Sequence, residues 1–176
     1  MRVLPVLDDP LYFTGLITLG AGFLLLVLNA VLQPFTLSAS AQRFELSYAL
    51  HVSAFIALLS LLSIAMAWHN IPPGQTARVY YELLFWGGGH TMQFSYTVLL
   101  AVCWLYLCSA SGCQPRLNEQ LGLILFSLLL TPAVLTPVFD IVYPVTSYEH
   151  HEAFTLAMRY GGLAVVPLMI VVLLAW

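Results

Sequence analysis

The stretch from Leu121 to Val142 reads LGLILFSLLLTPAVLTPVFDIV, and Asp140 is its only charged residue. A helix of about 20 residues, rising 1.5 Å per residue, spans the hydrocarbon core of a bilayer. This stretch is therefore long enough and apolar enough to cross a membrane as one helix.

Four other stretches have the same character, and short connections join all five. Prolines and glycines such as Pro72, Gly74 and Pro144 mark the expected helix ends, because proline cannot donate the next backbone hydrogen bond. We predict an all-α membrane protein in which residues 1–176 form a single transmembrane helical bundle. The predicted spans are Tyr12–Leu32, Tyr48–Trp68, Tyr80–Cys108, Leu121–Val142 and Ala153–Trp176.

The composition supports this class and excludes others. Hydrophobic residues make up 61% of the chain and charged residues only 7%, whereas soluble domains have roughly 25% charged residues. The net charge of −3 argues against a nucleic-acid partner. The three cysteines have no Cys-x-x-Cys spacing and are interpreted as packing residues.

Because the last apolar stretch has no polar tail, we expect a piece of a longer membrane protein; the alternative is a small five-helix protein.

Three histidines in two places are the main candidates for function. His90 lies in the run WGGGHTMQF, residues 86–94, within the third predicted span, and His150-His151 follow the fourth. A histidine within a membrane span is by default a functional residue, and three converging imidazoles suit a transition metal. The alternating direction of the spans puts all three at one side. Convergence requires the segment Tyr143–Glu152 to dip toward the bundle as buried, non-helical backbone.

The residues around His90 allow two interpretations. A Gly87-Gly88-Gly89 triplet costs helix stability, and it either lets a bulky group approach the backbone or lets helices pack closely. Trp86 lies four residues before His90 and shares its helix face, which makes it a candidate cofactor contact. Gln93 is a candidate to orient the imidazole or a bound ligand.

The order of these residues resembles subunit I of the heme-copper respiratory oxidases and the related nitric oxide reductases. In that family one histidine of the sixth helix and an adjacent pair after the seventh bind copper-B, so the resemblance assigns these roles to His90, His150 and His151. The five spans then match helices four to eight of a twelve-helix bundle, and residues 5–15 resemble the approach to the fourth helix. The heme ligands of the family belong to its second and tenth helices, outside this match.

The resemblance also implies an activity and its partners. The complete protein would reduce O2 or NO at a heme and copper-B centre of a respiratory chain. Its partners would be the lipid bilayer, other oxidase subunits and an electron donor of the cytochrome c or cupredoxin type, in a bacterial inner membrane. This chain alone would lack the heme ligands, so we expect no turnover from it.

One departure from the family pattern concerns a redox-active tyrosine. Many oxidases have it four residues after the sixth-helix histidine, where this chain has Phe94. One subclass takes the tyrosine from the seventh helix, which makes Tyr143 and Tyr148 the candidates here. The nitric oxide reductases do without it, so O2 and NO both stay open as substrates.

Two other functions fit the same residues. A membrane b-type cytochrome would use histidines as axial heme ligands, and a non-catalytic transporter or assembly bundle would leave His150-His151 at the surface. Separately, Asp140 and Arg159 lie within consecutive apolar spans, so we predict that they form an ion pair.

Overall fold

The computed structural model describes residues 9–33, 41–113 and 117–174, and within these ranges it contains helices and no strand. Residues 5–8 of the oxidase-like stretch, and Trp176 at the end of the predicted last span, lie outside the described residues. The helices are α1 (Pro10–Leu32), α2 (Ala41–Asn70), α3 (Ala77–Ala110), α4 (Glu119–Val142), α5 (Tyr148–Gly161), a 3-10 turn η1 (Gly162–Val165) and α6 (Val166–Leu173).

Capping side chains account for several helix starts. The Asp9 carboxylate accepts hydrogen bonds from the backbone N–H groups of Leu11 and Tyr12 at the start of α1. Asn118 accepts one from Leu121 at the start of α4. Each cap satisfies backbone donors that have no partner within the helix itself. As a result both helices begin two residues before the apolar runs that predicted them.

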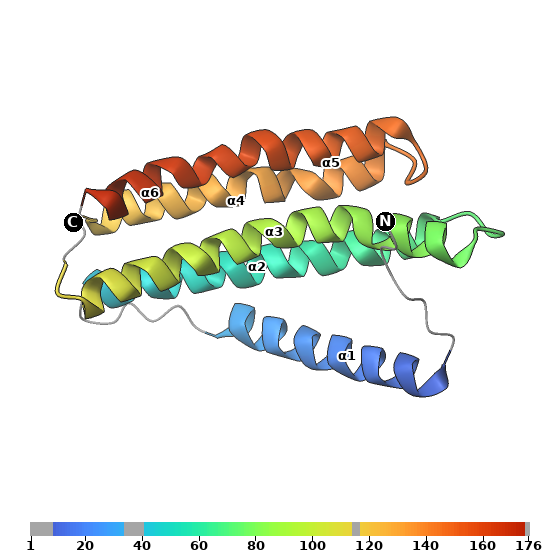
Figure 1. The fold of residues 1–176 in the computed structure, drawn as a ribbon, viewed down its shortest axis with the longest axis horizontal. Coiled ribbons are helices and arrows are strands. Elements are labelled where there is room, and N and C mark those ends of the chain that lie inside the picture. The colour runs from blue at the N-terminus through green and yellow to red at the C-terminus, as the bar shows by residue number, and fades with distance from the viewer. Residues whose placement is uncertain (1–8, 34–40, 114–116, 175–176) are drawn as a thin grey trace.

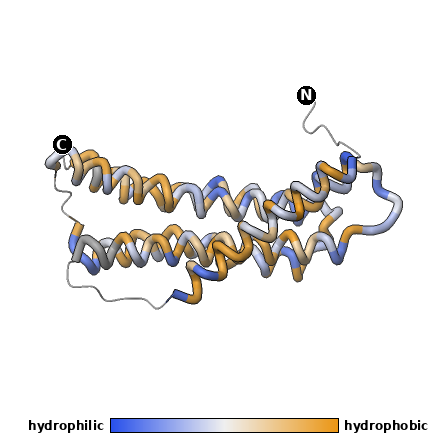
Figure 2. The backbone as a smooth tube through the Cα atoms, turned by 90° about the horizontal axis from the view of Figure 1, so that it is seen from below, coloured by the Kyte–Doolittle hydropathy of each residue, from blue (hydrophilic) through white to orange (hydrophobic). Residues whose placement is uncertain are grey.

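Five segments are long and apolar enough to cross a membrane, as predicted: α1, the Leu46–Asn70 part of α2, α3, α4, and the Tyr148–Val171 run through α5, η1 and α6. Figure 2 shows hydrophobic residues along the length of every helix, which is the pattern of helices surrounded by lipid or by other helices. The chain is therefore a helical membrane protein. The larger twelve-helix bundle remains an expectation from the resemblance.

The helices lie in pairs (Figure 1). α2 lies beside α3, and α4 lies beside the α5–α6 span, while α1 crosses at the edge of the bundle with most of its surface exposed. The turn before α3 and the turn between α4 and α5 lie at the same end. The core between the pairs contains Ile56, Phe94, Phe126, Leu129 and Leu168.

Small residues bring α3 against α2. The Ser60 hydroxyl of α2 donates to the Gly88 carbonyl oxygen at 2.7 Å. A Cβ added at Gly88 would meet the Ser60 carbonyl oxygen at 2.9 Å and the side chain of Ile64. One at Gly87 would meet the Ser63 hydroxyl at 2.7 Å and the Phe154 ring at 2.8 Å. Two of the three glycines therefore serve close packing, as small residues do between membrane helices.

Prolines interrupt two spans, and local bonds compensate. Pro137 cannot donate to the Ala133 carbonyl oxygen, which instead accepts from the Thr136 hydroxyl at 2.8 Å. Pro167 cannot donate to the Leu163 carbonyl oxygen, which is bonded by the N–H of Val166. That shorter bond explains the 3-10 turn between α5 and α6.

Gly88 and Gly89 provide a matched test of the α2–α3 packing, because a Cβ at Gly89 would meet no atom of the described residues within 4 Å. We expect Gly88→Ala to lower the free energy of unfolding by about 1–3 kcal/mol through overpacking. Gly89→Ala should leave it unchanged or raise it by up to about 1 kcal/mol, since alanine favours helix. Unfolding of both variants in one detergent, followed by circular dichroism, measures the difference; equal losses at the two positions would contradict the packing explanation.

Candidate functional site

The adjacent histidines lie in the first turn of α5 and not in a dipping loop. Ser147 is the N-cap, and its hydroxyl accepts from the N–H of His150 at 3.1 Å. The expectation of non-helical backbone throughout Tyr143–Glu152 is therefore wrong, because the helix begins at Tyr148. Ser147 lies three residues before His150, the first histidine of the pair, and a serine at this position is a recognisable N-cap signal.

His90 is half-buried on α3, and its Nδ1 lies 2.7 Å from the carbonyl oxygen of Trp86. His151, on α5, makes the same type of contact: its Nδ1 lies 3.0 Å from the carbonyl oxygen of Ser147. A carbonyl oxygen can only accept, so Nδ1 carries the proton in both rings. In each neutral imidazole the Nε2 lone pair is then left available.

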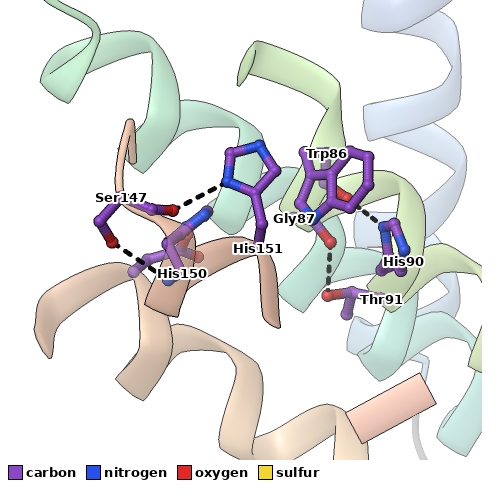
Figure 3. A network of polar contacts seen from close by, with 8 residues as sticks. Trp86, Gly87, His90, Thr91, Ser147, His150 and His151 are labelled. Carbon is purple, nitrogen blue, oxygen red and sulfur yellow. Dashed lines mark hydrogen bonds and ion pairs between the residues drawn. The ribbon is translucent and has the colours of Figure 1, made fainter. Parts of the chain in front are cut away.

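Trp86 contacts both of these rings. The centroid of its ring lies 4.6 Å from that of His90 and 4.7 Å from that of His151. Figure 3 shows the indole between the two imidazoles. The structure therefore brings α3 and α5 together through an aromatic contact at the predicted site, with Trp86 at its centre.

His150 is fully buried and faces a carboxylate. Its Nε2 lies 3.0 Å from Oδ1 of Asp140, and the two side chains are 0% and 1% exposed. The His150 ring also lies 5.8 Å from the His151 ring and 4.9 Å from the ring of Phe154, centroid to centroid. Asp140 therefore takes His150 as its partner. The predicted pair with Arg159 is wrong, since Arg159 is exposed and has no ion pair among the described residues.

Several buried polar atoms around this site lack a hydrogen-bond partner. Within the described ranges they are Ser63 Oγ, Trp86 Nε1, Asp140 Oδ2 and His150 Nδ1. Ser63 and Phe154 both lie against Gly87, and the Phe154 ring contacts His150, which places these atoms in one region where α2, α3, α4 and α5 meet. Buried polar groups without partners are rare in proteins, and here they gather at one place.

The three histidines lie in one region, but they do not form a closed metal site. In the part of the chain that the structure describes, no three His, Cys, Asp or Glu side chains are placed so that they could hold one metal ion. The indole of Trp86 lies between two of these histidines, His90 and His151.

Among the described residues, the remaining candidates have no hydrogen bond or ring contact with the three imidazoles. Tyr148 is 74% exposed, and its hydroxyl donates to Glu152 at 3.3 Å. Tyr143 is the half-buried C-cap of α4. Gln93 is exposed, and the Trp86 carbonyl orients His90 in its place. The sequence analysis does not predict the contact between Asp140 and His150. The signal for it is that the carboxylate lies near the end of one span and the histidine lies ten residues later, just beyond the short connection to the next helix.

Comparison with known proteins gives relatives of unassigned activity. The chain is 27% identical over 171 residues to the uncharacterized protein RP382 of Rickettsia prowazekii (strain Madrid E), a match that covers 92% of this chain and 32% of that protein. It is 34% identical over 87 residues to an uncharacterized protein of Aquifex aeolicus (strain VF5), covering 49% and 18%. The chain thus spans a third or less of these relatives. No family model matches it, and no solved structure does.

Ser147→Ala tests whether the N-cap holds the histidine pair on α5. Losing the cap should weaken the first turn by about 1 kcal/mol, which speeds amide hydrogen exchange at His150 roughly fivefold. The control is Thr146→Ala, because Thr146 is exposed and has no hydrogen bond among the described side chains. Exchange measured by NMR in micelles should change only in the Ser147 variant, and identical rates in both variants would contradict the assignment.

Proposed function

We propose that this chain forms the copper-B part of a heme-copper oxidase-type catalytic subunit, with His90, His150 and His151 as the copper ligands. The complete subunit would reduce O2 or NO, with heme ligands supplied from outside these residues. It would work in a bacterial inner membrane and receive electrons from a cytochrome c or cupredoxin-type donor.

One observation carries this proposal: each of the three imidazoles has one ring nitrogen held, and the other has no partner among the residues that the structure describes. Nδ1 is held in His90 and His151, and Nε2 is held in His150. Metal-binding histidines characteristically have this arrangement, because a carbonyl or carboxylate on one nitrogen sets the tautomer and orients the other toward the ion. Three neutral imidazoles are a donor set that suits copper.

The surroundings of the rings also suit a site for a small apolar gas. Phe154 is buried against His150, and Phe139 packs on Phe154 with centroids 5.4 Å apart. The Phe154 ring covers one side of the buried His150 with apolar surface. A copper ion bound there would supply a one-electron redox centre with an open coordination position.

Trp86 sets a requirement for this function. Its indole lies between His90 and His151, so the three histidines can share one ion only if the indole moves aside. Trp86 Nε1 has no hydrogen-bond partner among the described residues, so no such bond opposes that movement.

The length of the relatives is compatible with a larger subunit. About two thirds of the Rickettsia protein lies outside its match to this chain. That remainder is long enough to contain further helices, including ones that could carry heme ligands.

Copper titration of the purified chain in detergent tests the proposal. We expect one copper(I) ion per chain, measured by competition with a chromogenic chelator. Alanine at His90, His150 or His151 should each weaken binding by more than about 100-fold, beyond the effect typical of losing an outer partner.

The matched controls are His51→Ala and His69→Ala. Both ring nitrogens of His51 have backbone partners in Ser47 and Gln33, and His69 is exposed at the end of α2. Neither change should alter the copper affinity. Heme binding without copper would instead favour a b-type cytochrome, and binding of neither would leave a non-catalytic bundle; both outcomes reject the proposal.

A further inference from the structure

Arg159 places a charge in the middle of the last membrane span. The span runs from Tyr148 to Val171, and Arg159 is the twelfth of its 24 residues. At 1.5 Å per residue, it lies roughly 17 Å from either end of the span. Its side chain is exposed and has no hydrogen bond or ion pair among the residues that the structure describes. An arginine near a helix end can extend to the aqueous interface, but one at this depth needs a partner within the membrane.

Arg159 faces away from the helices of the described bundle. Two residues further on, a Cβ at Gly161 would meet the side chains of Pro132 at 2.5 Å and Phe94 at 3.1 Å, so that side of α5 lies against α4 and α3. Two residues turn an α-helix by about 200°, which puts Arg159 on the opposite side. The described residues therefore supply no partner in the direction in which the guanidinium points.

The surface around Arg159 is otherwise apolar. Leu156 and Leu163 lie three residues before it and four residues after it on the same helix face, and they are 36% and 61% exposed. Val166 continues this face and is 43% exposed. Together these four residues form the Arg159 face. Contact with lipid would leave its charge unpaired, whereas contact with another helix can both pair the charge and cover the apolar side chains.

We propose that the Arg159 face docks a transmembrane helix of a different sequence, which carries an aspartate or glutamate near its midpoint. Charge complementarity identifies this partner, because a carboxylate can accept two parallel hydrogen bonds from a guanidinium and neutralises it away from water. About two thirds of the Rickettsia relative lies outside its match to this chain, which leaves room for such a helix in that protein.

A second copy of this chain does not supply the carboxylate. A symmetric pair of Arg159 faces would bring two like charges together. The acidic residues of the described ranges all lie within six residues of a helix end, so none of them is near the middle of a span. They are Asp9, Glu45, Glu82, Glu119, Asp140, Glu149 and Glu152.

Association of the purified chain with designed transmembrane peptides tests the docking. The probes are three leucine-alanine helices of about 20 residues. One carries aspartate at its midpoint, one carries aspartate at its end, and one has leucine at both places. Fluorescence energy transfer between the labelled chain and each labelled peptide in lipid vesicles measures their association. We expect the probe with the central aspartate to bind roughly 5- to 30-fold more tightly than the other two, which is the range for polar contacts between model membrane helices.

Arg159→Leu should abolish this preference, because the guanidinium is the group that recognises the carboxylate. The matched control is Arg78→Leu, since Arg78 is also exposed but lies in the first turn of α3, and this variant should retain the preference. Circular dichroism checks that both variants keep their helices. Equal binding of the three probes to the unmodified chain would overturn the proposal, and so would a preference that persists in Arg159→Leu.

The same measurement without peptide distinguishes a second copy from the proposed partner. If two labelled chains associate and Arg159→Leu separates them, the occupant of the Arg159 face is another copy and the proposed partner is wrong. The Arg159 face contains none of the three histidines, so the result of the copper titration does not bear on this docking.

Discussion

The contact between Asp140 and His150 is the interaction on which the arrangement of this site depends. A carboxylate near the end of a membrane helix needs a hydrogen-bond donor within the protein, since lipid provides none. The first turn of α5 provides that donor, 3.0 Å away. This contact holds the start of α5 against the end of α4. His151 is the next residue of the same turn, so the Asp140–His150 contact also determines where the His151 ring meets Trp86.

The other half of the site depends on how closely α3 approaches its neighbours. Gly88 allows α3 to contact the backbone of α2 at Ser60, and Gly87 leaves room for the ring of Phe154 from α5. His90 lies within one turn of both glycines. The features that looked like separate signals in the sequence, a glycine triplet and isolated histidines, are therefore parts of one arrangement in which small residues bring polar ones together.

The membrane spans could be predicted from the sequence because apolar length is a property of each segment alone. The start of the last span could not, since hydropathy favoured Ala153 whereas the Ser147 cap begins the helix at Tyr148. That the candidate histidines lie in one region followed from topology. The partner of Asp140 depends on the directions of side chains on two helices, and residue spacing does not determine these directions. For this reason the predicted Asp140–Arg159 ion pair is wrong.

Pro137 has a consequence for the carboxylate that lies three residues further along α4. Where an ordinary residue would add a backbone hydrogen bond, the helix relies on the hydroxyl of Thr136. One fewer main-chain bond therefore ties the final turn to the body of α4, and helices bend most easily at such points. Asp140 is thus carried by a turn whose tie to the rest of α4 depends partly on the side chain of Thr136, so the sequence just before the carboxylate helps to set where it meets α5.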